Sequence, residues 1–386
     1  MNENSFDVAI IGGGPVGAAL AIALQGNDLK VVLLEARESE INTTDPRALA
    51  LSYGTRLLLQ RLGAWDTMQN VCGIKTIEVT QKGSPGHTTM HADEMEVSEM
   101  GYVLPYTTLH AALQQALQRS DINCLYGAAV SDLRSSRENT TLIYQHKGQE
   151  HTLTARLAVV AEGGKLLEVS HPPQIQDYGQ SGIIAHVTSS KSGPAVAFEH
   201  FTPQGPMALL PYLDGYELVL TAAHDTAQEM LAWDDATFLQ RLQEHFGDRV
   251  GTFTSVGKRN CYPLRLKRAP DITFPRTVLI GNAAQTLHPV AGQGFNMGIR
   301  DAWELAQVIL DSAPEDIGSA AMCAAYRKSR RIDRNAGIRF TDGLVRLFSN
   351  DLPLLGHVRS AALTLLDCIP PAKKFVAKRM MFGANG

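Results

Sequence analysis

The chain has 386 residues, 44% of them hydrophobic, which is enough for a sizeable core and two domains. Its formal net charge of −4 gives no reason to expect a nucleic-acid partner, and no metal-ligand pattern is present. Five scattered cysteines without CxxC spacing, no basic segment before an apolar one, and no apolar run near 18 residues predict a cytoplasmic protein with neither disulfides nor a membrane span.

The first forty residues predict a strand, a glycine turn, a helix and a second strand. The apolar segments 6–11 and 29–34 are of strand type, and a small-residue helix is expected over 18–24. The helix N-terminus offers free N–H groups and partial positive charge to phosphates. This order of elements is typical of a dinucleotide-binding fold.

Four residues in this segment predict the cofactor contacts. Gly12 permits the tight turn, Gly14 lets a pyrophosphate approach the backbone, and Gly17 allows close helix–strand packing. Glu35 ends the second strand near the spacing of an acid that binds a ribose hydroxyl. Because Glu35 would repel a 2′-phosphate, FAD or NAD is favoured. The alternative is a glycine turn that binds nothing.

Arg47 follows the polar loop 36–44 and Pro46. A helix is expected to begin here, because helical periodicity continues to Trp65. Arg47 is then placed either to reach the pyrophosphate or flavin region, or as a solvated arginine at a helix end.

The next segments alternate between strands and one helix. A hairpin is expected over 74–95, a helix over 109–117, and a β-meander over 125–160. The last strand runs into Glu162 and two glycines. A strand that ends in an acid and glycines is a second place where a nucleotide or flavin meets the edge of a parallel sheet.

Residues 180–265 predict a mostly antiparallel second domain, after which the chain returns to the nucleotide fold. An apolar strand over 276–280 leads into Gly281, and two further glycines at 292 and 294 precede a helix over 297–310. Free N–H groups at that helix start suit an electron-rich carbonyl edge such as a flavin pyrimidine. An ordinary glycine-rich loop is the alternative.

Three segments together resemble the fingerprints of the group A flavin monooxygenases, the p-hydroxybenzoate-hydroxylase-like family: 12–17, 161–163 and 281–296. The similarity runs nearly end to end, and 47–51, 201–206, 257–264 and 281–289 are most similar to the ubiquinone-biosynthesis branch. The resemblance implies an α/β fold, with a Rossmann-type, glutathione-reductase-like FAD-binding domain, an inserted mostly antiparallel β substrate domain and a helical C-terminus. We assign 1–73, 99–178 and 268–330 to the FAD-binding domain, 74–98 and 179–267 to the substrate domain, and 331–386 to the C-terminal helical region.

The resemblance implies FAD as cofactor, NAD(P)H as co-substrate, and O2 and a prenylated phenol of the 2-polyprenyl-6-methoxyphenol type as substrates. The phenol would be hydroxylated through a flavin C4a-hydroperoxide. The implied cofactor-binding residues are Gly12, Gly14, Pro15, Val16, Gly17, Glu35, Ala36, Arg47, Val130, Glu162, Gly281, Asn282, Pro289, Gly292, Gly294, Phe295 and Asn296.

The sequence departs from this family at three positions. Asn282 stands where most members have the aspartate that binds the ribityl chain, and an amide still donates and accepts there. Glu162 with two glycines replaces the usual Asp-Gly-Ser with its basic residue, and Tyr106 lies near the position of a helix arginine. His288 is the candidate catalytic residue for moving the phenol proton, because imidazole titrates near neutral pH. Its alternative is a hydrogen bond to the loop backbone.

Three functions remain open from the sequence: a monooxygenase, a flavin reductase or oxidase of the same fold acting on prenyl lipids, and a non-catalytic flavin-bearing subunit of a biosynthetic complex. The C-terminal segment interleaves apolar residues with cations over 373–382. It is expected either to rest on a membrane surface or a partner, or to pack as a helix with a solvated basic end. The sequence also leaves open whether the protein forms a homo-oligomer.

Overall fold

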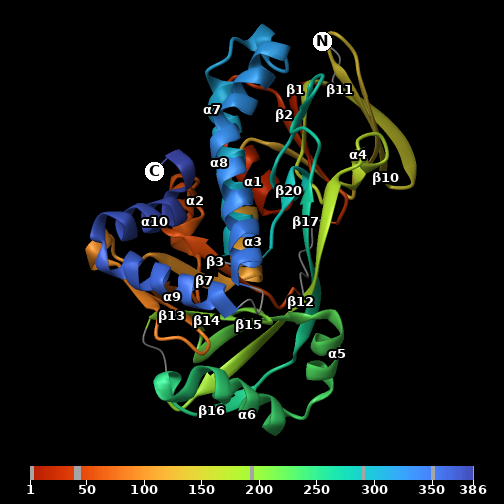
Figure 1. Ribbon diagram of the computed structural model, residues 1–386. Helices are drawn as coiled ribbons and strands as arrows, with labels where there is room; N and C mark the ends of the chain where they lie inside the picture. The colour runs from red at the N-terminus through yellow and green to blue at the C-terminus, as the bar shows by residue number, and fades with distance from the viewer. Residues whose placement is uncertain (1–3, 39–44, 192–194, 289–291, 349–352, 386) are drawn as a thin grey trace.

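The computed structural model describes residues 4–38, 45–191, 195–288, 292–348 and 353–385 (Figure 1). Its first unit is built on an eight-stranded sheet with the order β18-β19-β11-β1-β2-β8, in which β9 and β10 extend from β11. The strands are β1 (Ser5–Ile11), β2 (Val31–Glu35), β8 (Asn123–Tyr126), β9 (Ala129–Ser135), β10 (Thr140–His146), β11 (Gln149–Val160), β18 (Thr273–Phe274) and β19 (Thr277–Leu279).

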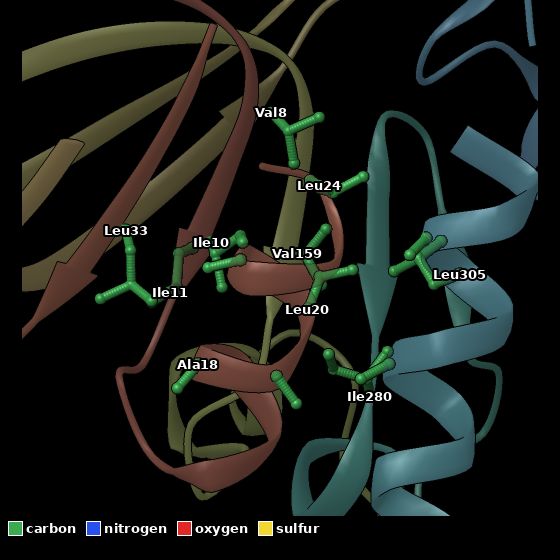
Figure 2. Close-up of a cluster of buried hydrophobic side chains, with 14 of the residues drawn as sticks. Val8, Ile10, Ile11, Ala18, Leu20, Leu24, Leu33, Val159, Ile280 and Leu305 are labelled. Atoms are coloured by element: carbon green, nitrogen blue, oxygen red, sulfur yellow. The ribbon is translucent and has the colours of Figure 1, made fainter. Parts of the chain in front are cut away.

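The centre of this sheet is parallel and covered on both faces. β1 pairs in parallel with β2 and β11, β2 with β8, and β11 with β19. Helix α1 (Pro15–Ala23) lies between the sheet and α7 (Gln293–Leu310), and Figure 2 shows Leu20 between Val159, Ile280 and Leu305. These four residues are buried. Burial on both faces explains why β1 and β2 are continuous apolar runs rather than alternating ones.

A second, nine-stranded sheet has the order β20-β17-β12-β15-β14-β13-β5-β6, with β16 beside β12. All its pairs are antiparallel except β13 with β5. Its strands are β5 (Thr76–Gln81), β6 (His87–His91), β12 (Gln174–Ser189), β13 (Val196–Thr202), β14 (Gly205–Tyr212), β15 (Gly215–Ala223), β16 (Phe253–Val256), β17 (Asn260–Arg268) and β20 (Gln285–Thr286). The antiparallel character predicted for 180–265 is therefore confirmed.

The two faces of this sheet pack against different parts of the molecule. We call the outer face the side that carries Phe198, Leu209 and Leu218, which share a core with α5 (His224–Ala232) and α6 (Asp235–Phe246). In Figure 1 these helices lie on the far side of the sheet from α9 (Pro353–Cys368). Because side chains alternate along a strand, the neighbouring residues, such as Ala197 and Phe201, belong to the opposite or inner face. That face is turned toward α9, α8 (Ala320–Phe348) and the first unit.

The expectation that a helix begins at Arg47 is wrong. Ala48–Ser52 forms strand β3, which pairs antiparallel with β7 (Gly101–Pro105), and β7 also pairs with β4 (Cys72–Ile74). Helix α2 (Tyr53–Arg61) begins only after Ser52, whose side chain caps it by accepting a hydrogen bond from the N–H of Thr55. The pairing with β7 overrides the local helix signal. The hairpin of β5 and β6 and the helix α3 (Tyr106–Gln118) confirm the other two expectations for this region.

The described part of the C-terminal region 331–386 is helical, as expected. Helices α8 and α9 are followed by α10 (Pro370–Phe382), whose Ala377 and Met381 pack with Met90 and Met95 in a small core. Among the described residues, no helix combines the length and the apolar character that crossing a bilayer requires.

Candidate functional site

The glycine turn after β1 leaves one open position. Gly12 has φ +107, and a Cβ placed there would lie 2.8 Å from the backbone nitrogen of Glu162. A Cβ on Gly17 would lie 2.0 Å from the carbonyl oxygen of Gly12, so these two glycines are required by packing. Gly14 has nothing within 4 Å of such a Cβ. It precedes Pro15, the first residue of α1, whose N-terminus lacks a side-chain cap. The open face at Gly14 therefore fits the approach of a pyrophosphate.

Glu35 lies directly beside this turn. Its Oε2 accepts a 2.7 Å hydrogen bond from the N–H of Gly13, and its Oε1 accepts one of 2.9 Å from Nε of Arg37. Burial acts to raise the pKa of Glu35, but the hydrogen bonds from Arg37 and Gly13 hold this pKa below its usual value. The N–H of Ala128 donates to the carbonyl of Glu35, which brings Val130 near Glu35 and the exposed Ala36.

Two arginines flank Tyr106 at the start of α3. The Arg47 guanidinium forms a 2.6 Å ion pair with Asp45 and lies 5.8 Å from the Tyr106 ring centroid. Arg37 interacts with the Tyr106 hydroxyl, and burial raises the pKa of that hydroxyl despite both cations. Sequence reasoning missed Arg37, although a basic residue two positions after the strand-ending acid was a usable signal. The arginine absent at 106 is thus matched by two cations from the preceding loop.

The two predicted glycine segments meet at Val16. A Cβ on Gly281, which has φ +58, would lie 3.2 Å from both methyl carbons of Val16, and one on Gly298 would lie 2.9 Å from its Cγ2. Val16 is therefore held between the end of the third fingerprint's strand and α7. Asn282 follows Gly281 and is exposed. Segments about 265 residues apart in the sequence are in contact, as a single ligand spanning both would require.

The start of α7 carries the second open position. Gly292 has φ +60 and backs onto Ala50, whose Cβ would lie 3.0 Å from a Cβ on Gly292. Gly294 has nothing within 4 Å of a Cβ. Phe295 packs on the main core, and the buried Asn296 side chain bonds Ser52, Ala50 and Gly292. Asn296 therefore holds the loop against β3 with its side chain. Pro289 lies outside the described residues.

The middle fingerprint forms a turn stabilised by the second sheet. The Glu162 side chain accepts a 3.3 Å hydrogen bond from the N–H of Leu166, at the start of α4 (Lys165–Glu168). Lys267 from β17 donates to the carbonyl of Gly163 at 3.2 Å and pairs with Glu168. Lys165 already places a basic residue directly after the two glycines. Lys267 of β17 adds a second cation at this turn, through a contact that local sequence gives no signal for.

His288 is buried at the inner face. Its ring meets that of Tyr178 edge-on, with centroids 5.5 Å apart, and the Tyr178 hydroxyl donates to Asp342 at 3.0 Å. Burial lowers the pKa of His288 to about 4, so the imidazole is neutral at physiological pH and is a weaker base than a solvated histidine.

Two carboxyl groups that sequence reasoning missed also lie on the inner face. Glu217 on β15 is buried and takes a hydrogen bond from the backbone N–H of Ala48, while burial raises its pKa to about 7. Glu199 on β13 has a pKa raised to about 8 by burial alone. The signal available in the sequence was a glutamate at an inner-facing position of a strand whose alternate neighbours, Ala197 and Phe201, are apolar.

The arrangement fits FAD in shape and chemistry. Glu35 lies beside the glycine turn at Gly13, the open Gly14 begins α1, the exposed Asn282 follows the contact of Gly281 with Val16, and the open Gly294 lies at the start of α7. A shorter mononucleotide would leave one of the two open glycine positions unused.

Comparison with known proteins agrees with this geometry. Residues 5–337 match the family model described as FAD binding domain. Ubiquinone hydroxylase UbiL of Rhodospirillum rubrum is 33% identical, over 97% of this chain and 89% of that protein. The 3-demethoxyubiquinol 3-hydroxylase of Escherichia coli is 29% identical, over 94% and 95%. The crystal structure of HpxO from Klebsiella pneumoniae complexed with FAD superimposes with a TM-score of 0.76 at 16% identity, covering 99% of this chain and all of that one, which shows a shared fold.

Proposed function

This chain belongs to the FAD binding domain family and is an FAD-dependent monooxygenase, and from that premise we propose that it hydroxylates the ring of a 2-polyprenyl-6-methoxyphenol. A place in ubiquinone biosynthesis is supported by the relatives that carry hydroxylase names from that pathway. The observation that carries the proposal is the contact of Val16 with Gly281 and Gly298, which joins the two glycine segments into one extended site.

Bound FAD supplies the activation of O2 with electrons from NAD(P)H. In the proposal, the α1 N-terminus and Gly14 receive the pyrophosphate, Glu35 the adenosine ribose, and Asn282 the ribityl chain. Arg47 adds positive charge near the phosphates. The loop from Gly292 to Asn296 borders the flavin, with Pro289 beside the ring.

His288 is proposed to conduct the phenol proton. Its support is its position four residues before that loop and against Tyr178 on the inner face. With a pKa of about 4 it is neutral at pH 7, so it would relay a proton rather than retain one.

The inner face supports an apolar substrate. Phe201, Val345 and Leu363 form a buried cluster against Val79 and Tyr178, between β13, α8 and α9. Apolar surroundings of this kind favour a prenyl chain and help to exclude water from the reacting ring.

Peripheral membrane contact is also proposed, with α9 as the contact element. Val358 and Leu365 are both 59% exposed and lie seven residues apart on one face of the helix, and Ile369, 41% exposed, follows the helix end. On α10, Phe375 is 61% exposed between the exposed Lys374 and Lys378. Apolar side chains beside cations suit an anionic bilayer surface. Lys373 does not share this role, because it is buried and paired with Glu94.

The decisive experiment is anaerobic reduction of the FAD-loaded protein by NAD(P)H, with and without candidate phenols, followed by a pulse of oxygen. A phenol that accelerates reduction and gains one oxygen atom supports the proposal. Product formed without oxygen would instead assign a reductase, and bound FAD that no phenol or NAD(P)H affects would assign a non-catalytic subunit.

A further inference from the structure

Glu199 is an acid in the middle of an apolar surface. On β13 it lies between Ala197, which belongs to a cluster with Tyr212 and Val103, and Phe201, which belongs to the cluster with Val345 and Leu363. The register places Ala208 of β14 on one side of Glu199 and Val79 of β5 on the other. Paired residues on neighbouring strands share a face, so Glu199 points inward with these apolar neighbours.

The Glu199 carboxyl has neither a hydrogen-bond partner nor a neighbouring charge among the described residues. Only burial shifts its pKa, with no charged neighbour contributing. A carboxyl that is largely removed from water without a partner costs free energy. Glu199 nevertheless retains partial exposure, as a side chain does when space remains between a sheet and the helices that cover it.

Glu217 provides an internal comparison. It lies on the same inner face, because Glu199 is opposite Ala208, and Leu210 two residues further along β14 is opposite Glu217. The N–H of Ala48 satisfies Glu217 and so ties β15 to β3. A structural role therefore explains one of the two carboxyls and leaves Glu199 unexplained.

Two chains of contacts connect the surroundings of Glu199 to the start of α7. On one side, Phe201 packs with Tyr178, whose ring meets His288, four residues before Gly292 in the chain. On the other side, Ala197 shares a cluster with Ala48 of β3, and Ala50 of the same strand backs Gly292. Glu199 therefore lies on the same face as two sets of residues that lead to the start of α7, one through Tyr178 and His288 and the other through β3.

We propose that Glu199 receives the phenolic hydroxyl of the substrate: its carboxylate accepts the O–H hydrogen bond and takes the proton as the ring is hydroxylated. In this step the O–H bond breaks, its electron pair moves into the ring, and the ring carbon bonds one oxygen atom of O2. NAD(P)H supplies the two electrons through FAD, and the second oxygen atom leaves as water. The hydroxylated carbon then loses its hydrogen as a proton, which completes the water formed from the second oxygen atom. The proton held by Glu199 returns to the phenolic oxygen, so the carboxyl is unchanged after turnover.

Burial raises the pKa of Glu199 to about 8, so at neutral pH only the minor, ionised form of the carboxyl can act as the acceptor, and hydroxylation should speed up as the pH rises toward this value. The assignment gives the phenol proton a first acceptor and leaves His288 as the onward relay. It rests on the proposed function, since it specifies how the same site recognises its substrate.

The test uses the FAD-loaded protein and three variants, E199Q, E199A and the matched control E78Q. Glu78 lies on the neighbouring strand β5 opposite Phe198, on the outer face. The probes are 2-prenyl-6-methoxyphenol with a single isoprene unit and its O-methyl ether. Binding is followed by the change in the flavin spectrum, and hydroxylation by single-turnover product yield.

Wild type and E78Q should bind the phenol at least tenfold more tightly than the ether, which lacks the proton to donate. E199Q and E199A should lose that preference and hydroxylate about 100-fold more slowly. They should keep FAD and unfold at the same temperature as wild type or higher, because a partnerless carboxyl has been removed. Loss of FAD or a lowered unfolding temperature in both variants would assign Glu199 a structural role and overturn the inference.

Hydroxylation by E199Q and E199A within threefold of wild type, or an unchanged preference for phenol over ether, would also overturn the inference while the proposed function stands. If the wild-type protein hydroxylates no phenol, the proposed function itself fails and takes the inference with it. The wild-type arm therefore separates the two failures.

Discussion

The carboxamide of Asn296 accepts a 2.8 Å hydrogen bond from the backbone N–H of Ser52, 244 residues earlier in the chain. Its amide group donates to the carbonyls of Ala50 and Gly292, at 3.0 and 2.7 Å. One buried side chain thus fixes β3 against the N-terminus of α7. The loop proposed to border the flavin is held in place before any cofactor binds.

Replacing Asn296 by leucine should therefore destabilise the protein itself. Three buried hydrogen bonds are lost and their backbone partners are left unsatisfied, which predicts a decrease of about 2–4 kcal/mol in the free energy of unfolding. Urea unfolding of the FAD-free protein measures it. Asn282 offers a matched control, because it is exposed: N282L should leave this stability unchanged and speed the loss of FAD. Equal unfolding midpoints for N296L and wild type would contradict the claim that Asn296 fixes β3 against the N-terminus of α7.

The two glycines that flank α1's first residues should respond oppositely to alanine. Gly14 has φ −63 and open space around its missing Cβ, so G14A should fold normally but bind FAD at least tenfold more weakly. G17A places a Cβ 2.0 Å from the carbonyl oxygen of Gly12 and should lower the unfolding temperature by several degrees. FAD fluorescence titration and thermal unfolding of both variants distinguish the two roles. If G14A binds FAD with normal affinity, the pyrophosphate does not bind against Gly14.

Glu35 predicts a pH-dependent contribution to stability. Its folded pKa is lowered below the ordinary 4.5, so the carboxylate stabilises the fold fully above about pH 4.5, and this contribution is lost as the pH falls through the lowered value. E35Q should therefore be about 1–2 kcal/mol less stable than wild type at pH 7. The difference should shrink on acidification. Urea unfolding at a series of pH values measures it, and a gap that does not change with pH would show that the charge of Glu35 has no part in it.

The exposed stripe on α9 predicts a membrane-binding phenotype without loss of fold. V358S together with L365S should weaken sedimentation with anionic vesicles severalfold, because two exposed apolar side chains are removed from the contact. Point substitutions are preferable to truncation at Lys373. Truncation would delete Ala377 and Met381 from a core, and with them the hydrogen bond from the N–H of Ala384 to Asp333. Vesicle binding equal to wild type at unchanged stability would reject this surface.

Features fixed by local geometry could be predicted from the sequence, and features fixed by distant contacts could not. Gly12 and Gly17 were predictable, because their constraint is local: a tight turn and a helix packed on its own strand. The strand at Ala48–Ser52 was not, since it exists only through pairing with β7, about fifty residues away in the sequence. Lys267 reaches the carbonyl of Gly163 through a tertiary contact that no motif records.

Glu199 illustrates the remaining limit. Its alternation with Ala197 and Phe201 was visible in the sequence, but the meaning of that alternation depended on knowing which face of the sheet is covered. Only the register of β13 with β14 and β5 shows that the acid points inward. The sequence therefore predicts that Glu199 lies on a strand, but only the folded structure shows which residues surround it.

The most direct test of the account is a crystal structure of the protein purified with its FAD. The account predicts one FAD per chain, with its pyrophosphate against Gly14, its ribose at Glu35 and its flavin ring against the loop of Gly292 to Asn296. Density for FAD at any other place, or a ring that does not reach this loop, would contradict the claim that the two glycine segments hold one cofactor.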